Sequence, residues 1–212
     1  MRQRGFLGLF FAAMLGLLAP AVTRADLLVY ATNSTASAGG TGSFEVVVQN
    51  TGSTSYNITS FNTKLYVFSG TGLTFTGADE LNTDYGYIFG SVQSGALGIV
   101  DGDTIMLSDF DTNAVPPWAT LGAGASLSLG NVYYSLDAGA PLDGTNPIAI
   151  NFDLTQIYDD SSPNFLEIAL TTQGGAVTVP VPEPGTLVLA GLVSSLGGVC
   201  VYKRRRAGQL VA

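Results

Sequence analysis

Short runs in which apolar and polar residues alternate fill the middle of this 212-residue chain. In the segment 148–154, every second residue is large and apolar: Ile148, Ile150, Phe152 and Leu154. A period of two residues is typical of a β-strand with one buried face. The same period recurs at 44–48 and 166–170, and no window of the body shows the 3.6-residue period of an amphipathic helix. The sequence therefore predicts a β protein.

Seven strand-like runs are separated by Gly, Asn, Ser or Pro, the residues that favour turns. They cover residues 27–31, 43–49, 60–68, 104–108, 126–135, 148–154 and 166–170. Strands of this length and spacing favour an all-β fold, a two-sheet antiparallel sandwich of the immunoglobulin-like or jelly-roll type, over a barrel. The absence of an internal sequence repeat argues against a solenoid.

The first 25 residues have the layout of a secretory signal peptide. Arg2 and Arg4 precede an apolar stretch at 5–19, expected to be helical, and small residues up to Ala25 offer a cleavage site. Cleavage after Ala21 and an uncleaved N-terminal anchor are the alternatives, although fifteen apolar residues are few for a stable span. Cleavage after Ala25 leaves a body at 26–179, whose length is typical of one domain.

Three features follow one another at the C-terminus. A proline-rich motif comes first: Val181, Pro182, Glu183 and Pro184. An apolar stretch at 185–202 follows; at ~1.5 Å per residue it is about 27 Å long, close to the lower limit for a transmembrane helix. Four cations then end it: Lys203, Arg204, Arg205 and Arg206. Because short basic segments stay in the cytoplasm, we expect 207–212 to be a cytoplasmic tail and the body to lie outside.

In this order and position, the three features resemble the C-terminal sorting signal of the PEP-CTERM family of exported bacterial proteins, over residues 180–206. The resemblance implies an exosortase as partner, a membrane transpeptidase that cuts near the motif and passes the body to the cell surface or exopolysaccharide layer. An ordinary C-terminal anchor and a chance match are the alternatives. Since prolines restrict the backbone on both sides of Glu183, we expect the exosortase to recognise the carboxylate of this residue.

Charge separates the body from the two ends. Fifteen of the sixteen acidic residues lie between Asp26 and Val181, where Lys64 is the only basic residue, which gives this segment a net charge of −14. Nucleic acid is excluded as a partner because its binding requires cations that neutralise phosphate. Divalent cations and neutral or cationic polymers remain compatible.

The residue inventory argues against catalysis. The chain has no histidine, and its single cysteine, Cys200, lies in the predicted span. Serine–histidine and cysteine–histidine mechanisms and histidine-ligated zinc are therefore excluded. Hydrolysis of a glycan by two carboxylates remains an alternative, but nothing in the sequence marks one pair. We expect the body to be non-catalytic.

Two aspartate pairs flank the apolar run 105–107: Asp101 and Asp103 before it, Asp109 and Asp111 after it. Alternating carboxylates beside a turn-forming Gly suit Ca²⁺, which collects oxygen ligands. The alternative is that these are loop aspartates that stabilise turns through their own side chains. Calcium is the only cofactor that the sequence suggests.

Trp118, the only tryptophan, follows two prolines and is a candidate for stacking on a sugar ring. The tyrosines at 85, 87, 133 and 134 could add further sugar-stacking faces. The alternative is that these aromatic side chains cover the core or anchor loops.

The runs 44–52, 58–68, 127–134 and 148–154 resemble, in their order, the strands of cohesin-like and related carbohydrate-binding β-sandwiches. No motif diagnostic of a dockerin partner is present.

Three hypotheses for the function of the body follow from the sequence. The body is a non-catalytic structural or adhesive unit of the cell surface or extracellular matrix, a carbohydrate-binding module for exopolysaccharide, with or without calcium, or a glycan hydrolase that uses two aspartates.

Overall fold

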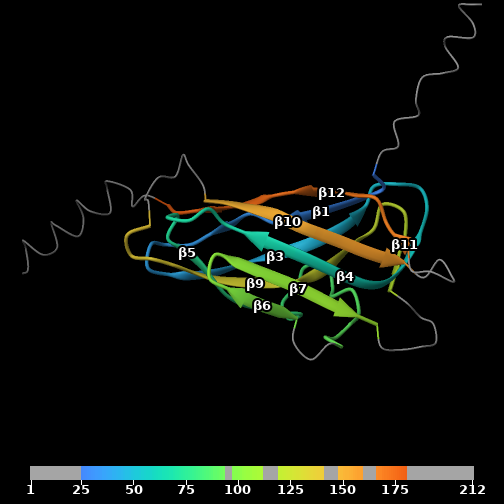
Figure 1. Ribbon diagram of the computed structural model, residues 1–212, viewed down its shortest axis with the longest axis horizontal. Coiled ribbons are helices and arrows are strands. Elements are labelled where there is room, and N and C mark those ends of the chain that lie inside the picture. The colour runs from blue at the N-terminus through green and yellow to red at the C-terminus, as the bar shows by residue number, and fades with distance from the viewer. Residues whose placement is uncertain (1–24, 94–96, 112–118, 141–147, 160–165, 181–212) are drawn as a thin grey trace, which may run out of the picture.

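The computed structural model describes residues 25–93, 97–111, 119–140, 148–159 and 166–180, which form thirteen strands and no helix (Figure 1). The strands form two sheets, one of five and one of eight strands. The predicted all-β sandwich is therefore confirmed. The signal helix and the transmembrane helix at 185–202 lie outside the described residues.

The five-stranded sheet has the order β12-β1-β3-β9-β5. Its strands are β12 (Leu170–Gln173), β1 (Leu27–Ala31), β3 (Thr41–Asn50), β9 (Ser126–Leu136) and β5 (Leu73–Asp79). β1 and β12, from opposite ends of the body, lie side by side and pair in parallel, with Leu27 opposite Leu170 (Figure 1). The other pairings in this sheet are antiparallel.

The eight-stranded sheet has the order β2-β13-β10-β4-β7-β6, with β11 beside β10 and β8 beside β4. Its strands are β2 (Ser34–Thr35), β13 (Gly175–Thr178), β10 (Ile148–Asp159), β4 (Tyr56–Tyr66), β7 (Thr104–Phe110), β6 (Gly98–Asp101), β11 (Leu166–Glu167) and β8 (Ala119–Leu121). Only β13 and β2 pair in parallel among these described strands, so both sheets are antiparallel apart from one short parallel pairing each.

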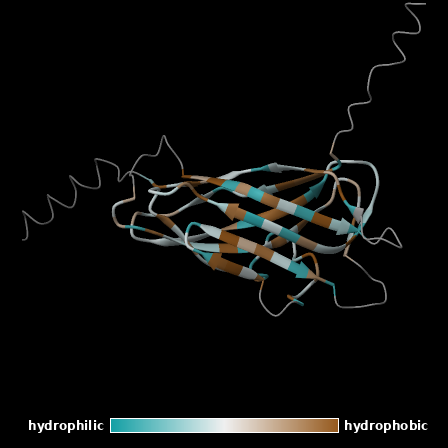
Figure 2. Ribbon diagram, viewed as in Figure 1, coloured by the Kyte–Doolittle hydropathy of each residue, from teal (hydrophilic) through white to brown (hydrophobic). Residues whose placement is uncertain are grey.

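The core lies between the two sheets and is lined mainly by alternate residues of the longer strands, whose hydropathy alternates along the ribbon (Figure 2). From the five-stranded sheet, Phe44 contacts Phe75 and Tyr134 at ring-centroid distances of 6.3 and 6.2 Å. From the eight-stranded sheet, Leu65 and Leu107 are fully buried. Burial of each such side chain contributes about 1.5–3 kcal/mol, which explains why the two-residue period predicts this fold.

All seven runs that the sequence identifies as strands are extended, with bounds that differ by a few residues. The run 166–170 is interrupted, because β11 pairs with β10 and β12 pairs with β1 in the other sheet. Five strands were not predicted: β2, β5, β6, β8 and β13. Most are too short for alternation to be visible; β5 is the exception, since Leu73 and Phe75 are buried between exposed threonines.

The prediction that Leu154 shares a face with Ile148 and Ile150 is wrong. The register between β10 and β4 shifts between Phe152 and Leu154, which marks a β-bulge. A bulge adds one residue to one strand and reverses which side chains face the core beyond it. Leu154 is therefore 44% exposed, and Ile157 is buried.

The segment between β5 and β6 joins the two sheets. Where β5 ends, the backbone of Gly86 and Ile88 takes its place beside β9: Ser128 donates its N–H to the Gly86 carbonyl, and Ile88 donates to the Ser128 carbonyl, both at 2.9 Å. Phe89 then stacks on Phe61 of β4 with a centroid distance of 6.0 Å. This segment closes one side of the sandwich.

Candidate functional site

Several predicted site residues lie outside the described part of the chain. They are Trp118, the sorting motif Val181, Pro182, Glu183 and Pro184, and the basic residues Lys203, Arg204, Arg205 and Arg206. Within the described ranges, no helix is long and apolar enough to span a membrane. The positions of the sorting motif and of the transmembrane span therefore remain predictions from the sequence.

The four aspartates fall into two separate pairs. Asp101 ends β6 and Asp103 follows in the turn before β7, whereas Asp109 and Asp111 lie at the far end of β7. At ~3.3 Å per residue, Asp103 and Asp109 are about 20 Å apart. No three acidic, histidine or cysteine side chains group around a metal-sized space in the described residues. One ion cannot bind both pairs, and a calcium site at either pair stays a prediction.

The prediction that Asp109 lies in a loop is wrong. It is an inward-facing residue of β7, only 2% exposed, at the next inward position after Ile105 and Leu107. Its carboxylate accepts a hydrogen bond from the Tyr87 hydroxyl at 2.7 Å and from the Gln93 N–H at 3.0 Å. Asp109 therefore holds the segment between β5 and β6 against β7.

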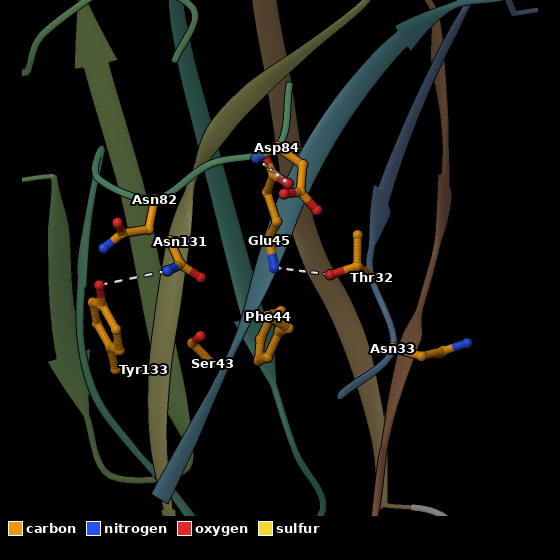
Figure 3. Close-up of a pocket in the computed structure, with 9 residues that line it drawn as sticks. All are labelled: Thr32, Asn33, Ser43, Phe44, Glu45, Asn82, Asp84, Asn131 and Tyr133. Carbon is orange, nitrogen blue, oxygen red and sulfur yellow. Dashed lines mark hydrogen bonds between the residues drawn. The ribbon is translucent and has the colours of Figure 1, made fainter. Parts of the chain in front are cut away.

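A groove lies on the outer face of the five-stranded sheet; Figure 3 shows the residues that line its polar part. One hollow, of about 400 Å³, is lined by Thr32, Asn33, Ser43, Phe44, Glu45, Asn82, Asp84, Asn131 and Tyr133. A second, of about 440 Å³, is lined by Thr41, Gly42, Ser43, Thr76, Tyr133 and Tyr134. Because Ser43 and Tyr133 line both, the two hollows adjoin. We call the pair the β3–β9 groove.

Glu45 anchors the first hollow. It is 7% exposed although it is charged, and its carboxylate accepts the backbone N–H groups of Asp84 and Tyr85 at 3.2 and 3.4 Å. Figure 3 shows Asp84 beside Glu45 over β3. The backbone of Glu45 is fixed on the other side by Thr32, whose hydroxyl accepts the Glu45 N–H at 2.9 Å. Glu45 thus positions the loop that forms one wall.

Tyr133 forms the opposite wall. Its hydroxyl donates to the carboxylate of Asp79 on β5, at 3.1 and 3.0 Å from the two oxygens, and accepts from Asn131 Nδ2 at 3.4 Å. Burial, then the hydrogen bond and the charge of Asp79, raise the pKa of Tyr133. The hydroxyl is therefore a fixed neutral group, and its ring is held at the junction of the two hollows.

Only some of the tyrosines proposed as sugar-stacking faces are accessible. Tyr134 is fully buried and Tyr87 is 8% exposed, so both belong to the core. Tyr85 is 43% exposed, and Tyr133 lines the β3–β9 groove.

The outer face of the eight-stranded sheet has a different character. Ile99 of β6 lies opposite Met106 of β7, Met106 opposite Lys64 of β4, and Lys64 opposite Leu154 of β10. Ile99 is 59% exposed and Phe110, at the end of β7, is 49% exposed. We call Ile99, Met106, Phe110 and Leu154 the apolar face.

Five tyrosines have a raised pKa: Tyr30, Tyr56, Tyr87, Tyr133 and Tyr134. Burial is the largest cause for each, and for Tyr30 and Tyr56 the pKa reaches about 12. A proton held more tightly in the native state stabilises it below the unfolded pKa of 10.0, and that stability is lost as the pH rises further.

We therefore expect the free energy of unfolding to fall steeply above pH 10. Buried Tyr87 alone contributes a slope of about 1.4 kcal/mol per pH unit, because the unfolded state releases its proton and the native state does not. Urea titrations between pH 9 and 11.5 measure the slope, and Tyr87→Phe should make it shallower by this amount. An equal slope in Tyr87→Phe would contradict the burial of that hydroxyl.

Sequence reasoning missed the β3–β9 groove. Glu45 is the only charged residue in the run 41–50, and a charge between Phe44 and three consecutive valines is a signal for a special position. Nothing in the sequence indicates that the loop carrying Asn82 and Asp84 folds over it, since that contact joins residues about forty positions apart.

Comparison with known proteins identifies the C-terminal segment. Residues 180–206 match the family model described as the PEP-CTERM protein-sorting motif. No curated protein matches the chain in sequence. The motif implies a secreted, surface-sorted protein that an exosortase processes.

The described sandwich is similar to solved cohesin domains. The seventh type I cohesin of ScaB from Pseudobacteroides cellulosolvens has 14% identity and a TM-score of 0.55, over 74% of this chain and 94% of that one. A type I cohesin from Clostridium thermocellum, solved as a cohesin–dockerin complex, has 17% identity and a TM-score of 0.55, over 74% and 96%.

A non-cellulosomal cohesin from the archaeon Archaeoglobus fulgidus is also similar, with 16% identity and a TM-score of 0.51, over 76% of this chain and 96% of that one. At these identities the likeness shows the fold alone. The chain thus combines a PEP-CTERM sorting motif with a body that has the cohesin β-sandwich fold.

Proposed function

We propose that this is an exported surface protein whose β-sandwich is a non-catalytic adhesive unit, attached to or released at the cell surface after an exosortase cuts near Val181–Pro184. The observation that carries the proposal is the sorting motif at 180–206 directly after a sandwich of this fold. In this scheme, the span at 185–202 anchors the chain only until it is processed.

The apolar face supports the adhesive role. Exposed large apolar side chains from β6, β7 and β10 gather on one sheet face, where a solvated sheet ordinarily carries polar residues. Such a patch, with polar residues around it, is typical of a protein interaction site. Cohesin of the same fold is solved in complex with a protein, a dockerin, so we propose a protein on the same cell surface as the partner.

Replacement of Glu183 by alanine should leave export intact and block maturation, because the motif keeps its prolines and loses its only charge. Intact mass spectrometry of the chain from its native cell measures the outcome: the variant should retain residues 185–212, whereas the wild type should lose them. Glu167→Ala, the same change at an exposed position of β11, is the control and should mature normally. Normal maturation of Glu183→Ala would contradict the role of that carboxylate.

A binding assay tests the adhesive role separately. Cells that lack the chain are incubated with the purified protein, and the bound fraction is measured as a function of concentration. The double variant Ile99→Asp, Leu154→Asp should bind at least about tenfold more weakly, since it replaces two of the exposed apolar side chains of this face by charges. Thr74→Asp, exposed on the other sheet, should bind like the wild type. Equal binding by the double variant would overturn the proposed surface.

A further inference from the structure

The β3–β9 groove lies on the opposite sheet from the apolar face, so the two are separate surfaces. Its first hollow contains two carboxylates, Glu45 and Asp84, and its lining has no lysine or arginine. The only basic residue of the body, Lys64, lies on β4 in the other sheet and pairs with Asp153 at 3.1 Å. An anionic ligand would be repelled here.

We propose that the β3–β9 groove binds a glycan chain that carries no acidic groups, with neighbouring sugar units in the two hollows. The proposal rests neither on Trp118 nor on the proposed adhesive role. The ligand would be a neutral or amine-bearing polysaccharide outside the cell, and the sugar units that enter the groove are small compared with a protein partner.

The chemistry of the lining fits sugar hydroxyls. Ser43, Asn131 and Asn82 supply groups that both donate and accept hydrogen bonds, and the carboxylates supply strong acceptors. Each hollow is within the size range of about 300–1,000 Å³ in which small ligands are bound. The Tyr133 ring offers an apolar surface at the junction of the polar first hollow and the more apolar second one.

The groove is also held in shape before a ligand arrives. Tyr133 is fixed by Asp79, and the loop that forms the wall is fixed by Glu45. Asn82 has a φ of 55°, the only positive value for a non-glycine residue in the described ranges. Asparagine adopts this left-handed conformation in turns more readily than most residues, so Asn82 suits the bend of the loop. A groove ordered in advance loses little entropy on binding.

A metal ion fits less well. The described residues contain no group of three or more metal-ligating side chains, and both oxygens of the buried Glu45 carboxylate already accept backbone N–H groups. Sugar hydroxyls can still donate to these oxygens, since a carboxylate has about four acceptor positions. The geometry therefore favours a glycan over a cation.

The test is a titration of the purified protein, followed by NMR, with three probes of equal length: oligomers of N-acetylglucosamine (neutral), glucosamine (amine-bearing) and galacturonic acid (anionic). We expect the first two to bind, with shifts confined to residues of the groove, and the third to show no saturable binding. Absence of binding by both non-acidic probes, or equal binding by the anionic one, would overturn the proposal.

Two variants test the location. Ser43→Tyr places a large side chain where the hollows adjoin and should weaken both complexes at least about tenfold; Thr74→Tyr, exposed on the same face outside both hollows, should not. Asp84→Asn should weaken the amine-bearing oligomer by about two- to fivefold and leave the neutral one unchanged. Asp101→Asn makes the same charge change on the other sheet and is its control. Unchanged affinity in Ser43→Tyr would place the glycan elsewhere and overturn the site.

Discussion

Replacement of Asp109 by alanine is expected to lower the free energy of unfolding by about 2–5 kcal/mol, a large part of the stability of a domain of this size. The carboxylate is 2% exposed and accepts hydrogen bonds from the Tyr87 hydroxyl and the Gln93 N–H. Without it, the buried Tyr87 hydroxyl loses its acceptor, and the partly buried Gln93 N–H loses its hydrogen bonds to this carboxylate. The segment between β5 and β6 also loses one of its attachments to β7, while the hydrogen bond from the Ser108 N–H to the Leu97 carbonyl remains.

Urea unfolding measures this effect through the midpoint and the slope. Asp101→Ala, an exposed aspartate on the neighbouring strand, is the control and should change stability by no more than about 0.5 kcal/mol. The double variant Asp109→Ala, Tyr87→Phe should cost less than the sum of the single variants, because Tyr87→Phe removes one of the donors that the first change leaves unpaired. Additive costs, or a loss as small as that of Asp101→Ala, would contradict the structural role.

Asp109 also shows what alternation can and cannot predict. The period of two that runs through Ile105 and Leu107 continues to position 109, so β7 places a carboxylate inside the sandwich. The sequence interpretation ended the strand at residue 108 and assigned Asp109 to a calcium-binding or turn-forming loop, because aspartates at alternate positions beside the apolar run 105–107 are typical of both. Its partners come from the segment after β5, which no local pattern links to β7.

The same limit applies to the β3–β9 groove. The outward residues of β3 and β9 follow from the predicted strands, since Ser43 lies opposite Tyr133 and Glu45 opposite Asn131. What turns this face into a groove is the loop at 80–85, which Glu45 holds through backbone N–H groups. Any loop offers such groups, so the sequence carries no signal for this contact. The longer strands and the two-sheet fold were therefore predictable, and Tyr133 was a candidate, whereas the groove around it was not.

Replacement of Gly130 by alanine is expected to cost about 2–4 kcal/mol of stability. Gly130 lies in β9 beside the register shift opposite Val46 and Val47, and its φ of 140° is rarely adopted by residues with a side chain. A Cβ at this position would lie 2.5 Å from Leu97 Cδ2 and 3.3 Å from the Asp79 carbonyl oxygen. The missing side chain thus makes room for Leu97, which is 3% exposed.

Gly77→Ala is the matched control, because Gly77 lies in the adjacent strand β5, its Cβ would contact nothing within 4 Å and its φ is not positive. Thermal unfolding of this variant should give a melting temperature equal to or slightly above that of the wild type. In a Leu97→Ala background, Gly130→Ala should cost less than it does alone, since the contact with Leu97 is gone and only the backbone strain and the carbonyl contact remain. If Gly130→Ala lowers stability equally in both backgrounds, backbone conformation alone requires the glycine. If it lowers stability in neither background, the close approach of the segment after β5 to β9 is contradicted.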